Sequence, residues 1–354
     1  MPFVLILTVL VFVHELGHYL IAIRNGVKVE VFSIGMGKEI FGFTDKNGTR
    51  WRFSLIPFGG YVMMYGDKDP SSTPSADDIK SMTEEEKNKS LIGKTPLQRI
   101  AVSFAGPFAN ILYAFVAMFF LYTFKGSPIN TNEIDKVYEN TPAYEISLKQ
   151  GDVIEKIDEY QINEGMDVIR VLQSLPKEKN SVSIEFKRDG EKIAKNLNFE
   201  SAKVIGVSFK KEYKTYSFFK SVLKSIEDTS YLTYKTLVGM IQLFSCNVSF
   251  KNLGGPLSIA KMSGDISMTG DFWYLIFFSA MISINLGLIN LFPFPALDGG
   301  NILVDAIELI IRKPLSLKLR EMISACGLFV LMGFMVFATL NDLTKFDFIR
   351  NLFN

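Results

Sequence analysis

The sequence predicts a polytopic α-helical membrane protein with four transmembrane helices, a β-hairpin that re-enters the membrane and one inserted α+β domain. Two observations support this fold class. The 354 residues are 48% hydrophobic, and the apolar ones gather in uncharged runs of the roughly 20 residues that a helix needs to cross a bilayer. Between these runs lie two segments with the alternation and turn signals of strands. The net charge of +1 gives no reason to expect a nucleic-acid partner.

The first apolar run, predicted as a transmembrane helix over residues 1–25, contains the motif HELGH. His14 and His18 are the only two histidines of the chain. Residues four apart share one face of a helix, so both imidazoles can bind one ion, and Glu15 can take a proton from a water beside it. Such a pattern can arise by chance, but three ionisable groups inside a membrane-type helix are costly and therefore indicate a polar cavity with a use.

Residues 26–98 are predicted to form a cytoplasmic loop that contains a strand hairpin at about 29–66, closed by the turn DKNG. The hairpin is too polar to span a membrane and too apolar for a simple loop. We expect it to re-enter the membrane against protein or a cavity, with a free strand edge near the metal. An ordinary cytosolic hairpin is the alternative. The polar linker that follows contains SMTEEE, which predicts a capping box and a short helix.

The second transmembrane helix is predicted over residues 99–125 and contains GPFAN. Its small residues favour close packing against the first helix, and we interpret Asn110 as a packing residue rather than a catalytic one.

Residues 126–203 are predicted to form the inserted domain. Its segment TPAYEISLKQGDVIEKIDEYQI resembles PDZ domains of bacterial proteases, which bind peptides by adding a strand to a sheet edge. A small αβ domain that acts only as a spacer or gate is the alternative. Residues 204–256 are amphipathic and are predicted to form helices on the membrane surface or against the helical bundle.

The third transmembrane helix is predicted over residues 271–298 and ends in NLFPFPALDGG. Pro293 and Pro295 break the helix, so this stretch must lie against protein or a wet cavity. Asp298 follows directly. Its carboxylate is a natural third zinc ligand, which leaves the fourth position to water.

A short helix and a basic connector are predicted over residues 299–320, a fourth transmembrane helix over 321–341 and a C-terminal tail over 342–354. The connector contains Arg312, Lys313, Lys318 and Arg320 without an intervening acid. By the positive-inside rule the connector and the 26–98 loop are cytoplasmic, while both termini and the inserted domain face the outside.

With HELGH, GPFAN, a PDZ-like domain and NLFPFPALDGG in this order, the chain resembles the site-2 protease family of intramembrane zinc metalloproteases. It looks closest to the bacterial regulator of sigma-E protease, although it has room for one PDZ domain where some members carry two. The resemblance implies a zinc metalloendopeptidase in which His14, His18 and Asp298 bind Zn²⁺ and Glu15 is the general base. It also implies substrate-binding roles, which we assign to Asn290, Gly35, Gly37, Pro293 and Pro295.

The resemblance further implies a multi-pass protein of the bacterial inner membrane, in contact with lipid, with a periplasmic PDZ domain and an active site toward the cytoplasmic side. The expected substrates are single-span membrane proteins of the anti-sigma-factor type and remnant signal peptides. A peptide or gating partner is expected for the PDZ domain.

Two other classes of function remain open at this point. A transporter would need ionisable groups inside several spans, and the second, third and fourth predicted spans have none in their interiors. A catalytically inactive membrane scaffold would bind transmembrane or extended peptides through the hairpin and the PDZ-like domain, and the presence of all four proposed catalytic residues argues against it.

Overall fold

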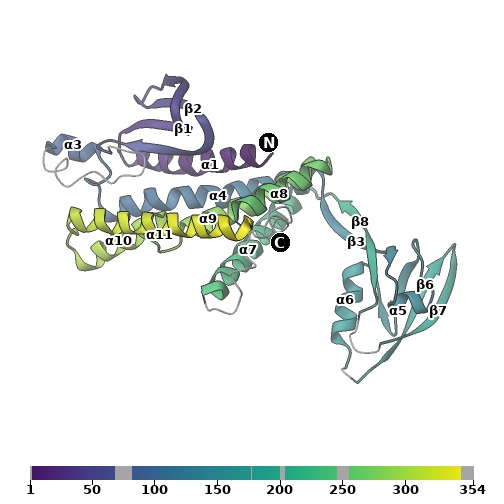
Figure 1. Cartoon of the computed structure of the whole chain (residues 1–354). Coiled ribbons are helices and arrows are strands. Elements are labelled where there is room, and N and C mark those ends of the chain that lie inside the picture. Colours follow the sequence, from purple (N-terminus) through teal and green to yellow (C-terminus); the bar gives the residue numbers. More distant parts are fainter. Residues whose placement is uncertain (1, 68–81, 177, 200–203, 245–254, 344–354) are drawn as a thin grey trace, which may run out of the picture. The chain divides into compact units, whose positions relative to one another are not determined.

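The computed structural model describes residues 2–67, 82–176, 178–199, 204–244 and 255–343. The chain divides into two compact units, one of Met1–Phe120 with Val222–Asn354 and the other of Leu121–Ser221. The elements that make up most of the first unit are α1 (Pro2–Arg24), β1 (Val29–Thr44), β2 (Arg50–Met64), α3 (Glu84–Lys89), α4 (Pro96–Phe124), α7 (Phe218–Phe244), α8 (Pro256–Met268), α9 (Phe272–Asn290), α10 (Asp298–Ile311) and α11 (Leu317–Leu343) (Figure 1).

Three helices of the first unit are long and apolar enough to cross a membrane: among the described residues these are α1, α4 and α9. They occupy the first three predicted spans, although α9 ends at Asn290, before the proline-containing stretch. The fourth predicted span falls within α11, a helix of 27 residues. That α11 crosses the membrane stays a prediction. Parts of several predicted segments lie outside the described residues: residue 1 of the first span, 68–81 of the polar linker, 177 and 200–203 of the inserted domain, 245–254 of the amphipathic segment and 344–354 of the tail.

The two strands β1 and β2 are bent, so that they form four paired segments rather than a simple hairpin. Residues 29–34 pair with 60–64 on one side and with 50–53 on the other, while 39–44 pair with 50–54. The bends fall at Gly35 and Gly37, both with φ of 88°, and near Gly59 with φ of 84°. Only glycine adopts such values readily. As a consequence, residues 60–64 are an edge segment of this sheet.

The inner face of the bent sheet packs on α1. Phe32 is fully buried, stacks on Trp51 at 4.2 Å between ring centroids and meets Tyr19 of α1 edge to face. Val29 and Met64 complete this core. Burial of these aromatic rings fixes the sheet against the helix that carries HELGH.

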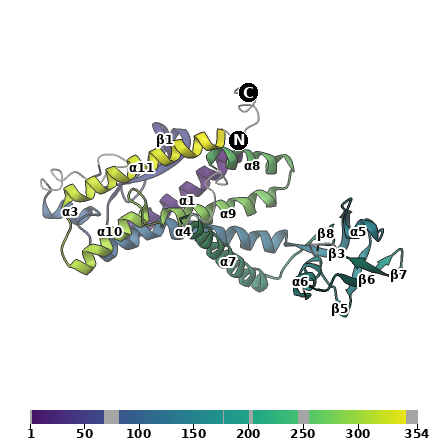
Figure 2. The same cartoon turned by 60° about the horizontal axis from the view of Figure 1, so that its bottom comes forward.

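Small residues allow the helices that carry the site to approach closely. Gly17 of α1 faces the backbone of Ala105 on α4, and Gly287 of α9 faces the Pro107 carbonyl of α4. A Cβ atom at either glycine would collide with that backbone. Helix α1 also contacts α8 and α9, as can be followed in Figure 2.

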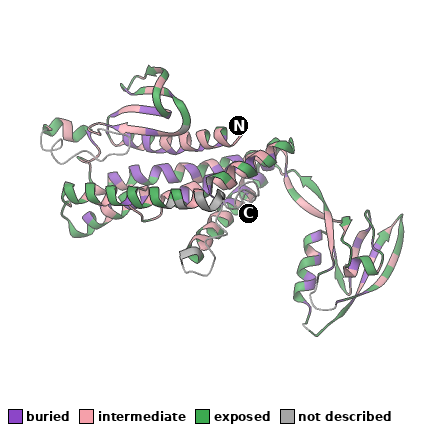
Figure 3. Ribbon diagram, viewed as in Figure 1, coloured by how far each residue is buried: buried purple, intermediate pink, exposed green. Residues whose placement is uncertain are grey.

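Helix α10 buries its polar side and exposes its apolar side. Its buried residues are Gly299, Gly300, Asp305 and Glu308, and its exposed residues include several aliphatic ones. Figure 3 colours the ribbon of each helix and strand by this burial. The exposed aliphatic residues are Leu303, Ile307, Leu309, Ile310 and Ile311. This distribution is the reverse of that of a helix on the surface of a soluble protein.

The second unit has a hydrophobic core of its own and one main sheet, of order β7-β6-β4-β3-β8 with β5 beside β4. Its elements are β3 (Ser127–Val137), α5 (Pro142–Glu145), β4 (Val153–Ile157), β5 (Tyr160–Gln161), α6 (Gly165–Ser174), β6 (Ser181–Arg188), β7 (Glu191–Asn198) and β8 (Val207–Lys214).

The sequence predicts helices from residue 204 onward, whereas Val207–Lys214 forms the strand β8. Val207 and Phe209 pack on the core of the second unit, and β8 pairs antiparallel with β3. Val207 and Phe209 alternate with polar residues, which is a strand pattern, but the lysines that follow obscure it in the sequence. The second unit therefore extends beyond the predicted boundary, whereas α7 is helical as predicted.

The predicted capping box is confirmed. Thr83 caps α3, its side chain accepts from the Glu86 backbone N–H, and the Glu86 carboxylate accepts from the Thr83 N–H at 2.8 Å.

Candidate metal centre and active site

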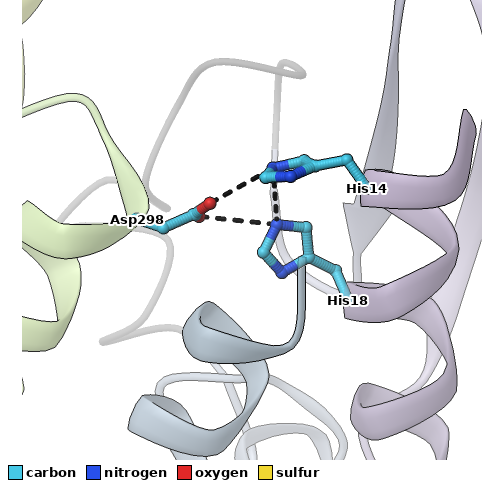
Figure 4. Close-up of side chains that lie close together, drawn as sticks. All are labelled: His14, His18 and Asp298. Carbon is cyan, nitrogen blue, oxygen red and sulfur yellow. Dashed lines mark hydrogen bonds and ion pairs between the residues drawn. The ribbon is translucent and has the colours of Figure 1, made fainter. Parts of the chain in front are cut away.

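Helix α1 presents two imidazoles on one face, as the spacing of HELGH predicts. Both rings are nearly buried, with 8% of His14 and 9% of His18 exposed. Their Nε2 atoms lie 3.2 Å apart and point to Asp298 (Figure 4). The Asp298 carboxylate is 3.2 Å from His14 Nε2 through Oδ2 and 3.5 Å from His18 Nε2 through Oδ1. The structure thus brings the two histidines together with an aspartate that lies 280 residues after His18 in the sequence.

These three side chains fit a tetrahedral zinc site. Zinc binds imidazole nitrogen and carboxylate oxygen at about 2.0–2.2 Å, so two ligand atoms of one tetrahedron lie roughly 3.3–3.5 Å apart. The separations of 3.2, 3.2 and 3.5 Å match these tetrahedral edges. Two imidazoles and one carboxylate form a donor set that zinc accepts, and it leaves a position for water or substrate.

The stretch between α9 and α10 positions Asp298 at the first residue of α10. Gly299 and Gly300 lie directly against the carbonyl groups of Leu291, Phe292 and Phe294, where a Cβ atom would not fit. The two glycines of LDGG therefore let the broken segment fold back onto the start of the helix. A carboxylate in the first turn is also favoured by the helix dipole.

Helix α11 supports the same stretch from its other side. Gly327 lies against the backbone and side chain of Pro295, so a larger residue there would displace the loop that leads to Asp298. Ala296 in this loop has φ of 74°, a conformation that costs a non-glycine residue energy and requires support from its surroundings.

Helix α4 packs against the two imidazoles, and the residues of GPFAN allow this close approach. Gly106 faces His18 Nε2 and His14 Cε1, and a Cβ atom there would occupy the space of the rings. Pro107 lacks the N–H that would bond to a carbonyl one turn earlier. The carbonyl oxygen of Val102, four residues before Gly106 on the same helix, lies 2.8 Å from His18 Nδ1. Because a carbonyl only accepts, Nδ1 of His18 carries the hydrogen and Nε2 is free for a metal.

Glu15 lies one residue beyond His14 and lines the same cavity as the three ligands. Its carboxylate accepts a hydrogen bond from the backbone of Val62, which belongs to the edge segment of the bent sheet. The sheet therefore orients the proposed base. The sequence alone shows the proximity of Glu15 to the ion but not this partner.

The cavity has a volume of about 490 Å³. Among the predicted substrate-binding residues, Asn290 lines it, and its Nδ2 lies 3.4 Å from His14 Nε2. The other four predicted residues, Gly35, Gly37, Pro293 and Pro295, are not among the lining residues, and their role in substrate binding stays a prediction. The bends at Gly35 and Gly37 and the contact of Pro295 with Gly327 give three of them a structural role.

Sequence reasoning missed several residues of the cavity wall. Gly60, Tyr61 and Val62 line it from the edge segment, Ser103 from α4 and Asn301 from α10. A signal was present for Asn301, because it follows Asp298 by three residues and therefore shares its helix face. No comparable signal marks Ser103, which is one of several small residues in a predicted span.

Comparisons with known proteins point to one family. A model of Peptidase family M50 matches residues 2–334. A protein of Agrobacterium fabrum that bears the name "putative zinc metalloprotease" is 34% identical over 361 residues, which cover 97% of this chain and 95% of the relative. Proteins with the same descriptive name from Clostridium perfringens and Rickettsia conorii are 35% and 32% identical, over 94% and 99% of this chain and 95% and 98% of their own lengths.

The fold and the site define a class: a helical chain with at least three membrane-type helices that brings the donor set of a mononuclear metal hydrolase together beside a glutamate. The matches make the assignment specific. The chain belongs to Peptidase family M50, the family of site-2 proteases, and the resemblance of the sequence to that family is confirmed.

Proposed function

We propose that the protein is a zinc metalloendopeptidase that cleaves transmembrane segments of single-span membrane proteins within the bilayer. The observation that carries the proposal is the convergence of His14, His18 and Asp298 in a cavity that Glu15 shares. His14, Glu15 and His18 lie on α1, a helix able to cross a membrane. Asp298 begins α10, which follows the loop after α9, another such helix. Ionisable groups are rarely retained in such a place without a functional use.

Each residue has a defined task in peptide hydrolysis. The chemistry that a bound zinc ion supplies is polarisation of the scissile carbonyl and of the attacking water. His14, His18 and Asp298 would hold the ion. Glu15 takes the proton of the attacking water and delivers it to the leaving amine, and its hydrogen bond from the Val62 backbone keeps the carboxylate directed at the cavity.

The edge segment 60–64 suits the binding of an extended substrate. A transmembrane helix hides its carbonyl groups in hydrogen bonds, so the substrate must unwind before cleavage, and new partners must replace the lost bonds. One side of residues 60–64 pairs with 29–34, while Gly60 and Val62 line the cavity. A substrate strand added to this edge would pass beside Glu15.

The remaining assignments extend the same proposal. The second unit, which includes β8, acts as a single PDZ domain on the periplasmic side, and α11 is the fourth span of a protein of the bacterial inner membrane, with the site toward the cytoplasm. Substrates of the anti-sigma-factor type or remnant signal peptides then reach the site in regulated intramembrane proteolysis. A peptide or gating partner binds the PDZ domain.

The test compares the wild type with Glu15→Gln and with Glu145→Gln, an exchange of the same kind at an exposed position of α5. Purified proteins are given a single-span reporter, and zinc content is measured in each sample. We expect all three to hold zinc, the wild type and Glu145→Gln to cut within the span, and Glu15→Gln to be slower by about 10²- to 10⁴-fold. Undiminished cleavage by Glu15→Gln would exclude the proposed mechanism, and absence of zinc from the wild type would favour an inactive scaffold.

A further inference from the structure

The further inference concerns Asn110, which sequence reasoning assigns to packing. Asn110 lies on α4 and is completely buried. Its side-chain Nδ2 is placed 3.2 Å from Nδ1 of His14, on the side of the ring that faces away from Asp298. Its Oδ1 is buried without a hydrogen-bond partner among the described residues. An unpartnered buried oxygen beside a ring nitrogen calls for an explanation.

The two rings face the same chemical requirement. A neutral imidazole carries one hydrogen, so an Nε2 atom can bind a metal only if the hydrogen is on Nδ1. For His18 the Val102 carbonyl, 2.8 Å from Nδ1, satisfies this requirement. For His14 the group opposite Nδ1 is the amide of Asn110, and an NH₂ group in that place cannot accept a hydrogen.

Reversal of the amide resolves this conflict. The oxygen and nitrogen of an asparagine side chain have nearly the same shape, and their assignment follows from the hydrogen-bond network. If the two atoms are exchanged, the unpartnered oxygen becomes the acceptor that the Nδ1–H of His14 needs. We propose that Asn110 is a positioning residue that accepts the Nδ1–H of His14 through Oδ1 and thereby fixes the tautomer and orientation of this ring for metal binding.

Helix α4 then orients both histidines of α1, one through a backbone carbonyl and one through a side chain. Hydrogen bonds of this kind to ligand imidazoles raise ligand basicity, and their loss costs about 10- to 100-fold in metal affinity or activity. The inference rests on the proposed function in so far as the ion is zinc, but the tautomer of His14 can be observed without metal. The two proposals can therefore fail separately.

The direct test is the tautomeric state of the two rings in zinc-free protein. Because the chain contains only two histidines, ¹⁵N-histidine labelling gives one set of ring signals for each. For rings observed in their neutral form, we expect the wild type to carry the hydrogen on Nδ1 in both. An Nε2–H tautomer at His14 of the wild-type protein would overturn the inference without any variant.

Three variants separate positioning from packing. Asn110→Leu keeps the size but removes the acceptor, Asn110→Asp keeps an acceptor and cannot donate when ionised, and Tyr113→Phe is the matched control. The Tyr113 hydroxyl bonds to Ser279 Oγ at 3.0 Å, so its loss removes another hydrogen bond between α4 and α9 without touching His14.

In Asn110→Leu we expect His14 to lose its uniform Nδ1–H tautomer while His18 keeps it, and zinc affinity to fall by about 10- to 100-fold. Asn110→Asp and Tyr113→Phe are expected to keep the wild-type tautomer and affinity. The inference is excluded if folded Asn110→Leu retains both properties, or if Asn110→Asp loses affinity as Asn110→Leu does. Failure of every variant and the wild type to bind zinc, with the expected tautomers present, would reject the proposed function but not the role of Asn110.

Discussion

Helix α10 carries two acidic clusters that behave differently. At its first residue, Asp298 faces His14 and His18 in a cavity. Two turns later, Asp305 and Glu308 are 2% and 4% exposed and face two arginines. Both clusters place ionisable side chains where the surrounding helices are apolar, but only the second pairs its carboxylates with arginines.

The second cluster, which we call the arginine clamp, consists of Arg99, Asp305, Glu308 and Arg320. Arg99 donates to Asp305 at 2.9 Å and also bonds to Glu308, while Arg320 donates to Asp305 at 2.6 Å and to Glu308 at 2.9 and 3.1 Å. The Glu308 carboxylate also accepts the Leu315 N–H. Two positive and two negative groups thus satisfy one another and join α10 to the starts of α4 and α11.

The difference between the clusters shows how a buried charge reveals its use. In the clamp each carboxylate faces two arginines, so its charge is balanced within the protein and it holds helices together. At Asp298 the carboxylate faces two imidazoles, and together they form a donor set that one metal ion can share. The first arrangement is structural, whereas the second has the donor set of a metal site.

The largest expected effect tests the open cluster. Asp298→Ala removes one of three ligands, and because changes to outer-shell partners already cost about 10- to 100-fold, we expect zinc affinity to fall by more than about 100-fold. Metal content after dialysis against a buffered zinc solution measures this. Asp265→Ala, at an exposed acid of α8, is the control and should retain zinc. Equal zinc content in both variants would remove Asp298 from the ligand set.

The intermediate effect tests the closed cluster. Arg320→Met leaves two buried carboxylates with one arginine, and removal of one partner from a buried ion pair typically costs about 3–5 kcal/mol. We expect the free energy of unfolding to fall by this order, as measured by denaturant unfolding in detergent, while the folded fraction still binds zinc. Lys318→Met, an exposed cation of the same helix without an ion pair among the described residues, should change little.

A double variant sharpens this prediction. Arg320→Met combined with Glu308→Met removes a positive and a negative group together, so the cost should be smaller than the sum of the two single changes. Additive effects would show that the clamp residues do not stabilise one another.

The two clusters also differ in how far the sequence predicts them. HELGH and LDGG mark His14, Glu15, His18 and Asp298, because the spacing within each motif carries the chemistry. Nothing marks the clamp. From the sequence, Arg320 is interpreted only as a base of the cytoplasmic connector, and nothing singles out Arg99, because pairing between residues more than 200 positions apart depends on how the helices pack. For the same reason the sequence does not reveal which group faces Nδ1 of either imidazole. Asn110 is the last residue of GPFAN, and Val102 lies four residues before the motif begins.

The bent sheet shows a similar limit. Alternation and the turn DKNG predict two strands over 29–66, and both strands form. The glycines at 35 and 37 suggest a special backbone, but they do not show that each strand folds back to give four segments. That outcome depends on Phe32, Trp51 and Tyr19 packing together, which is tertiary information.

The smallest expected effect concerns Asp67, a carboxylate with neither a metal nor an ion pair in the part of the chain that the structure describes. It accepts the Met64 N–H at 2.9 Å, at the end of the edge segment. Burial raises the pKa of Asp67 to about 7, with the hydrogen bond from Met64 opposing the shift and the charge of Glu30 adding to it. The folded protein therefore keeps this proton up to about neutral pH, whereas the unfolded chain releases it near pH 4.

Between these two pKa values unfolding releases a proton, so the free energy of unfolding falls as pH rises from about 4 to about 7 and levels off above. Asp67→Asn keeps an acceptor for the Met64 N–H but does not titrate. We expect the wild type to lose stability relative to Asp67→Asn between about pH 4 and pH 7. In a Trp273→Phe background, Trp51 is the only tryptophan and its fluorescence reports on melting of the sheet. Parallel melting curves for the two proteins across this pH range would show that Asp67 is ionised in the folded state, and the carboxylate would then belong with the solvated acids rather than with the two buried clusters.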